Sequence, residues 1–78
     1  MKKVHGLAKA FGKILAEERN KKNISQEQLA EMIDSNNVYV SLLENGQRQP
    51  SLNTVILLAK ALDISPSELM QRVYENIS

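Results

Sequence analysis

The 78-residue chain has no cysteine and a single histidine, His5. The absence of cysteine excludes disulfide bonds and zinc–thiolate sites, and one isolated histidine is expected to be a surface residue, so no metal is expected. No apolar run approaches the ~18–20 residues that a membrane-spanning helix needs. No apolar segment follows Lys2 and Lys3, so a signal peptide and a membrane location are not expected. The cytoplasm is therefore the expected compartment.

Proline, glycine and aromatic residues are also scarce, with two prolines, three glycines and 4% aromatic residues. The alternation of β-branched and aromatic residues that is typical of strands is missing, which predicts an all-α chain. Its length allows one domain, 1–78, whose core is thin because short chains bury only about 60–65% of their unfolded surface. No glycine-rich phosphate loop and no nucleophile–base pair is visible, so neither an enzyme nor a cofactor is expected.

The charges are unevenly distributed although the net charge is only +1. Residues 1–22 contain seven lysines and arginines and two glutamates. Residues 23–78 contain three lysines and arginines and seven aspartates and glutamates. The basic first third has two open interpretations. It is either an ordinary solvated helix face or a contact surface for an anionic partner.

Apolar spacing and turn residues predict five helices. They are expected at about 4–22, from a Ser25 capping box to Ile33, at 37–44 after an Asn36 cap, at about 52–62 after Ser51, and from Pro66 to about 75. Asn23 and the run 34–36 are expected to end helices, since Asn and Asp tolerate the left-handed backbone conformation. The residues expected to face the core in the first three helices are Val4, Leu7, Ala8, Phe11 and Leu15, then Leu29, Ala30, Met32 and Ile33, then Val40 and Leu43.

The second and third helices are joined by only three residues. Two short helices so connected must cross steeply, and the small side chain of Ala30 permits the close approach. The segment 25–44 is therefore predicted to be a helix-turn-helix, whose second helix can lie in the major groove of DNA.

Three segments carry a family resemblance that extends from Phe11 to Met70. They read ISQEQLAE (24–31), YVSLLENGQRQPS (39–51) and LAKALDISP (58–66). Together they resemble the Cro/CI-type (XRE) helix-turn-helix repressors. The resemblance implies a compact five-helix lambda-repressor-like domain, in a small stand-alone member similar to restriction–modification controller proteins. This sequence departs from the family pattern at three positions. They are Glu18, where leucine or alanine is usual, Asp34, where glycine is usual, and Ser35, where an apolar residue is usual.

The outward side of the helix 37–44 is expected to read DNA bases. Asparagine can bond adenine at two atoms, and valine can contact a thymine methyl group. The base-reading candidates are Asn36, Asn37, Val38, Ser41 and Leu42. Alternatives stay open for three of them: Asn36 as a helix cap only, Val38 as partly buried, and Leu42 as packed on a neighbouring helix.

Phosphate contacts are expected around this helix. The candidates are Gln26, Tyr39, Asn45, Gln47, Arg48 and Arg19. The alternatives are a plain capping residue for Gln26 and a solvated loop charge for Arg48. The resemblance also implies a structural pair between Arg19 and Glu44, in place of two unrelated surface charges. Because few cations are expected near this face, binding should depend only modestly on salt.

One recognition helix makes too few contacts for useful specificity, so a homodimer on a pseudo-palindromic operator is expected. The candidate interface is an apolar stripe on the last helix that consists of Met70, Val73, Tyr74 and Ile77. Ile56 or Leu57 of the preceding helix is a candidate addition to it. The alternative is that this helix packs back on the first. The predicted function is a sequence-specific transcriptional regulator that binds double-stranded DNA. The alternative is a protein–protein interaction module such as the antitoxin of a toxin–antitoxin pair.

Overall fold

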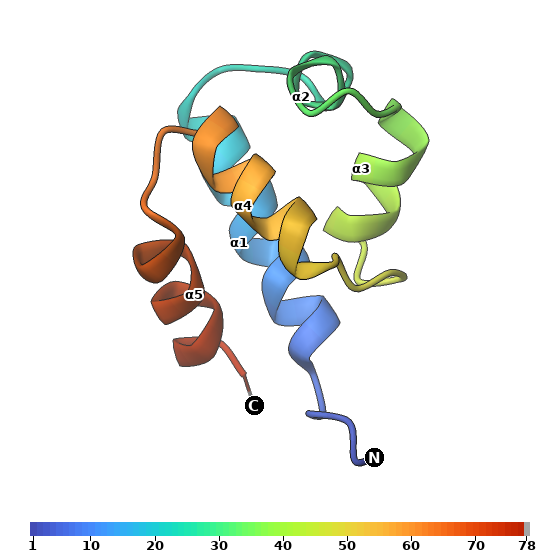
Figure 1. Cartoon of the computed structure of the whole chain (residues 1–78), viewed down its shortest axis with the longest axis vertical. Coiled ribbons are helices and arrows are strands. Elements are labelled where there is room, and N and C mark those ends of the chain that lie inside the picture. The colour runs from blue at the N-terminus through green and yellow to red at the C-terminus, as the bar shows by residue number, and fades with distance from the viewer. Residues whose placement is uncertain (78) are drawn as a thin grey trace.

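A computed structural model describes residues 1–77 and contains five α-helices. They are α1 (Leu7–Lys21), α2 (Gln26–Met32), α3 (Asn37–Glu44), α4 (Leu52–Ala61) and α5 (Pro66–Glu75). Figure 1 shows α3 and α5 on opposite sides of α1, with α2 across one end of the molecule. No strand occurs among the described residues, and the expected all-α, five-helix architecture is confirmed.

The predicted helix caps are present at the starts of four helices. Ser25 accepts a hydrogen bond from the Gln28 amide, and the Gln28 side chain accepts one from the Ser25 amide, which completes the capping box. Asn36 accepts a 2.9 Å bond from the amide of Tyr39. Ser51 and Ser65 cap α4 and α5 in the same way. Each of these side chains satisfies an amide that has no partner within its own helix.

Residues with positive φ end three of the helices. Asn23 has a φ of 57° and Asp34 a φ of 56°, as their positions in the sequence predicted, and Asp63 adopts 54°. Asparagine and aspartate visit this region at lower cost than most side chains, so the chain turns sharply after α1, α2 and α4 without glycine.

The start of α1 and the composition of two core faces differ from the prediction. Gly6 has a φ of 80°, so α1 begins at Leu7 and Val4 lies in the exposed segment that precedes it. The buried stripe of α1 includes Ala10 and Ile14, one residue before Phe11 and Leu15. Met32 is exposed as well, because Leu29, Ala30 and Ile33 fill the side of α2 that faces the core.

The core is formed by aliphatic side chains from all five helices. Helix α1 packs against α3 on one side and α5 on the other, while α2 packs on α3 and α4 packs on α5. The largest fully buried side chains are Ile14, Leu15, Leu29, Val40, Leu43, Leu58, Leu62, Leu69 and Val73. Burial of a side chain of this size contributes about 1.5–3 kcal/mol, so these nine residues dominate the stability of a small domain.

Helices α1 and α3 meet backbone to backbone at Gly12. A Cβ atom added to Gly12 would lie 2.4 Å from the carbonyl oxygen of Leu43 and 2.6 Å from that of Glu44. Real Cβ atoms do not approach oxygen so closely, so only glycine allows α1 to touch the last turn of α3. This contact fixes the distance between the central helix and the end of α3.

We expect Gly12→Ala to lower the free energy of unfolding by about 1–3 kcal/mol, because the added methyl group forces α1 and α3 apart. Helix propensity alone would give the opposite sign, a gain of about 1 kcal/mol. Urea denaturation followed by circular dichroism measures the change. The control is Asn20→Ala at an exposed site of the same helix, which should shift stability by no more than about 0.5 kcal/mol. An alanine variant at position 12 as stable as the wild type contradicts the proposed contact.

Candidate nucleic-acid interface

Helices α2 and α3 form a tight corner with one outward face. The amide of Ser35 donates a 2.8 Å hydrogen bond to the carbonyl of Ala30, which closes the turn. Ala30 is buried where the two helices meet, as its small size predicted, and the departure at Ser35 is solvent-exposed. Val40 and Leu43 are fully buried on the core side of α3. The opposite face of α3 is therefore held outward.

The base-reading candidates differ in their exposure. Asn36, Asn37 and Val38 are exposed in the first turn, and Val38 has 63% of its surface accessible. Ser41 and Leu42, one turn later, are half-buried. The oxygen of Asn36 is used by its capping bond, whereas the Asn37 side chain makes no hydrogen bond to any residue from 1 to 77. Asn37 and Val38 are thus the side chains most accessible to a groove.

An ion pair between Arg19 and Glu44 joins α1 to the end of α3. Arg19 donates through Nε to Glu44 Oε2 at 2.7 Å and through Nη2 to Oε1 at 3.0 Å, which gives the bidentate geometry of a strong pair. Its Nη1 donates to the carbonyl of Ile24 at 2.9 Å, and Gln26 Nε2 donates to Glu44 Oε1 at 2.9 Å. The structural pair that the resemblance implied is present, and Gln26 extends it.

This network shields most of the Arg19 and Glu44 side chains from solvent. The Arg19 side chain is 14% exposed and that of Glu44 is 6% exposed. The hydrogen bond with Glu44 raises the pKa of Arg19, against an opposing effect of burial. All three guanidinium nitrogens bond within the protein, and one hydrogen each remains on Nη1 and Nη2. The pair holds the end of α3, and the expected phosphate contact of Arg19 stays a prediction.

The loop that follows α3 presents polar side chains beside the same face. Asn45, Gln47 and Arg48 are exposed, and the amide of Gln47 bonds the carbonyl of Leu42 at 2.9 Å. The guanidinium carbon of Arg48 lies 5.9 Å from the ring centroid of Tyr39, within the range of a cation–π interaction. Sequence reasoning placed both residues at the interface but did not predict that Tyr39 orients Arg48.

The stripe expected at a dimer interface is divided by the structure. Val73 has 0% of its surface exposed and Ile77 is half-buried against the core, so α5 does pack back on α1. Val73 was wrongly assigned to the interface, because its spacing on α5 matches the core face together with Leu69. Met70 remains exposed, and Tyr74 is 72% exposed. Ile56 and Leu57 of α4 are exposed too.

Sequence reasoning also missed a charged cluster between α1 and α5. Glu18, the family departure, is 6% exposed and accepts hydrogen bonds from Arg72 and Lys21. Arg72 also pairs with Glu17 at 2.7 Å. Arg72 stands 54 residues after Glu18, and only the folded chain brings the two together.

Metal and membrane sites are not evident in the described part of the chain. Residues 1–77 contain no group of three or more histidine, cysteine, aspartate or glutamate side chains placed to hold a metal ion. None of the helices among them combines the length and the apolar composition needed to cross a bilayer. The arrangement of α2, α3 and the loop after α3 is the one surface feature that matches a recognisable binding motif in these residues.

A family model described as "Helix-turn-helix" matches residues 15–69. This chain belongs to that family. It is 44% identical over 54 residues to control protein C.SmaI of Serratia marcescens, and 39% identical over 51 residues to control protein C.BamHI of Bacillus amyloliquefaciens. These matches cover 69% and 65% of the chain but 64% and 63% of the relatives, so the chain spans slightly less than two thirds of their length.

Solved structures give the same family. The restriction-modification controller protein C.AhdI of Aeromonas hydrophila is 45% identical, with a TM-score of 0.76 over 80% of this chain and 94% of that one. The controller C.Esp1396I, solved as a tetramer with its natural 35 base-pair operator, is 22% identical with a TM-score of 0.81 over 91% of this chain and 93% of its own. The likeness to C.AhdI confirms the resemblance to XRE-type controller proteins. The likeness to C.Esp1396I shows the fold.

We expect Glu44→Ala to lower the free energy of unfolding by about 2–4 kcal/mol, since it leaves the mostly buried Arg19 charge without its carboxylate. The double variant Arg19→Met/Glu44→Met should lose less, because neither charge then remains unpaired. Thermal and urea denaturation measure both. Glu31→Ala, at an exposed acidic site on α2, is the control and should change stability by at most about 0.5 kcal/mol. If the double variant loses as much stability as Glu44→Ala or more, the pair does not act as a unit.

Proposed function

We propose that this protein is a sequence-specific DNA-binding transcriptional regulator that inserts α3 into the major groove of its operator. The observation that carries the proposal is the outward face of α3. Asn37 and Val38 are free at its first turn, while Val40 and Leu43 anchor its back and the Arg19–Glu44 pair holds its end. A rigidly held helix with unused polar and apolar groups at its start fits the geometry of major-groove reading.

Each side chain on this face has a chemistry that suits a base edge. The free amide of Asn37 can donate to adenine N7 and accept from its N6 amino group, and Val38 can contact a thymine methyl group. Ser41 and Leu42 lie one turn later and reach a neighbouring base pair. Asn36 uses its side-chain oxygen to cap α3, and its amide nitrogen is free to donate to DNA.

Polar groups on both sides of α3 suit the flanking phosphates. Gln26 lies at the start of α2, and its Nε2 keeps a second hydrogen for a phosphate oxygen beside its bond to Glu44. On the other side stand Tyr39, Asn45, Gln47 and Arg48, with the guanidinium of Arg48 held over the Tyr39 ring. Contacts of this kind fix the position of a protein on the duplex without reading its sequence.

The relatives support a role in gene control. Two of them are control proteins, and C.AhdI is a restriction-modification controller that shares 45% of the aligned residues. C.Esp1396I has the same fold in a complex with operator DNA. We therefore assign this chain to promoter or operator binding in the cytoplasm, with no catalytic step.

We further propose that the protein acts as a symmetric homodimer through α5 and the adjoining surface of α4. Met70 and Tyr74 of α5 and Ile56 and Leu57 of α4 are exposed apolar or aromatic side chains. Met70 also lines a hollow together with the buried Val55 and with residues of α1, so it stands where α5 adjoins both α4 and α1. Two-fold pairing places two copies of α3 about 34 Å apart, one turn of DNA, and calls for a pseudo-palindromic operator.

We expect Asn37→Ala to weaken binding to the operator by about 1–3 kcal/mol and to abolish the preference at one base pair in each half-site. Binding to random duplex DNA should remain nearly unchanged. Operators selected from a random duplex pool, followed by fluorescence anisotropy titrations, measure both effects. Gln71→Ala, at an exposed site of α5, the helix on the opposite side of α1 from α3, is the control and should leave the preference intact. Equal losses on operator and random DNA would rule out a base-reading role for Asn37.

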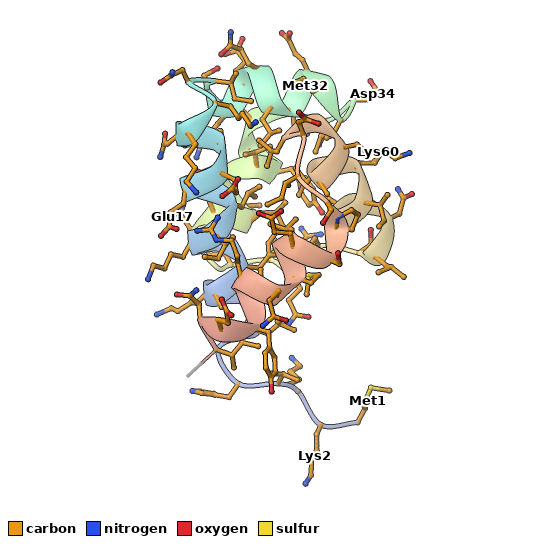
Figure 2. All side chains as sticks on the ribbon, turned by 90° about the vertical axis from the view of Figure 1, so that its left-hand side faces the viewer. Met1, Lys2, Glu17, Met32, Asp34 and Lys60 are labelled. Atoms are coloured by element: carbon orange, nitrogen blue, oxygen red, sulfur yellow. The ribbon has the colours of Figure 1, made fainter. Side chains whose placement is uncertain are left out.

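We expect Met70→Glu/Tyr74→Glu to weaken self-association at least tenfold, because each subunit then brings two like charges that have to be desolvated in the contact. Sedimentation velocity over a micromolar range of concentrations measures the dissociation constant. Met32→Glu introduces a charge at an exposed methionine at the other end of the molecule and should have no effect (Figure 2). A wild-type protein that stays monomeric both free and on DNA would end the dimer proposal.

A further inference from the structure

Two segments of the chain contain cations and no carboxylate. Residues 1–16 include Lys2, Lys3, Lys9 and Lys13, and the first acidic residue is Glu17. Residues 45–62 include Arg48 and Lys60, and they too contain no aspartate or glutamate. Since the whole protein carries nine acidic residues, a net charge of +1 conceals two regions that are purely basic.

The fold places part of these two segments side by side. A Cβ atom on Gly46 would lie 2.8 Å from Lys9 Cγ and 3.0 Å from Lys9 Cα, so the first turn of α1 rests on the loop after α3. Lys3 lines a shallow hollow together with Arg48 and the neighbouring loop residues. Lys3, Lys9 and Arg48 are exposed, and none of them forms an ion pair with a residue between 1 and 77. We call these three side chains the basic ridge.

The basic ridge is continuous with the face of α3 that points outward. The loop that carries Arg48 starts directly after Glu44, and the amide of Gln47 bonds back to the carbonyl of Leu42 in the last turn of α3. Arg48 in turn stacks on Tyr39, which belongs to the first half of α3. A duplex that holds α3 in its major groove therefore has one of its phosphate strands next to the ridge.

We propose that the basic ridge is a second contact surface for duplex DNA, in which Lys3 and Lys9 join Arg48 in binding phosphates beside the groove that α3 occupies. This inference rests on the proposed function and extends it to a segment outside the helix-turn-helix. Lysine offers a compact charge on a flexible stem, which suits a phosphate but does not distinguish bases. The ridge adds affinity for duplex DNA of any base sequence. It also makes DNA binding depend more strongly on salt than the amino-acid sequence predicted.

The test uses Lys3→Gln/Lys9→Gln as the ridge variant and Lys60→Glu as its control. Each lowers the net charge by two units. Lys60 lies at the opposite end of the molecule from the segment that precedes α1 (Figure 2). Anisotropy titrations on the selected operator and on random duplex DNA are made at several KCl concentrations. The ridge variant should reduce the slope of log K against log[KCl] by about 0.9 for each lysine and weaken binding on the order of 30-fold at 0.15 M salt, equally on both duplexes. Lys60→Glu should leave the slope unchanged. Circular dichroism and thermal melting check that both variants are folded.

The outcomes separate this inference from the proposed function. If the wild type selects an operator but the ridge variant keeps its slope, or Lys60→Glu lowers the slope equally, the ridge does not bind phosphates and the inference is wrong while the function stands. If the wild type binds no duplex, the proposed function itself fails. Single-stranded RNA of equal length is the competitor; RNA binding that only the ridge variant loses, with duplex binding intact, would assign the ridge to RNA and overturn the proposal.

Discussion

The mostly buried ion pair of Arg19 and Glu44 is the interaction on which the exposed face of α3 depends. It joins the end of α1, the carbonyl of Ile24 in the following turn, the start of α2 through Gln26, and the last residue of α3. A buried pair of charges is stable only when its hydrogen-bonding groups are satisfied, and no buried side-chain nitrogen or oxygen in residues 1–77 lacks a partner. The close approach at Gly12 places the two helices at the distance this pair requires. One polar network thus sets the orientation of the whole corner.

The features that could be predicted from the sequence are those fixed by neighbouring residues. A serine or asparagine three residues before a free amide makes a cap by itself, so the starts of α2 and α3 at Ser25 and Asn36 were foreseen correctly. The turn at Asp34 follows from the same local chemistry. Within the site, the exposed position of Asn37 follows from the burial of Val40 and from helical spacing alone. The role of Arg19 needed the family resemblance, because its partner is 25 residues away.

The features that were missed depend on which elements meet in space. Helical spacing marks an apolar stripe on α5 but does not say which half of it another helix covers, so Val73 was mistaken for a surface residue. Glu18 looked like a departure from the family, and only the position of Arg72 shows why it is tolerated. The approach of Lys9 to Gly46 is likewise a product of the α1–α3 packing. Charge counts along the chain therefore did not show that Lys9 lies beside the loop after α3.

The bonds of Arg72 to Glu17 and Glu18 have a consequence for the order of events in the proposed homodimer. They fasten α5 to α1 within one subunit, together with the buried Leu69 and Val73, so α5 is a finished element before any second copy arrives. In the proposed homodimer, assembly through α5 would therefore join two subunits that are already folded. Neither subunit would have to order α5 on contact, so the entropy of folding this helix would not oppose the association.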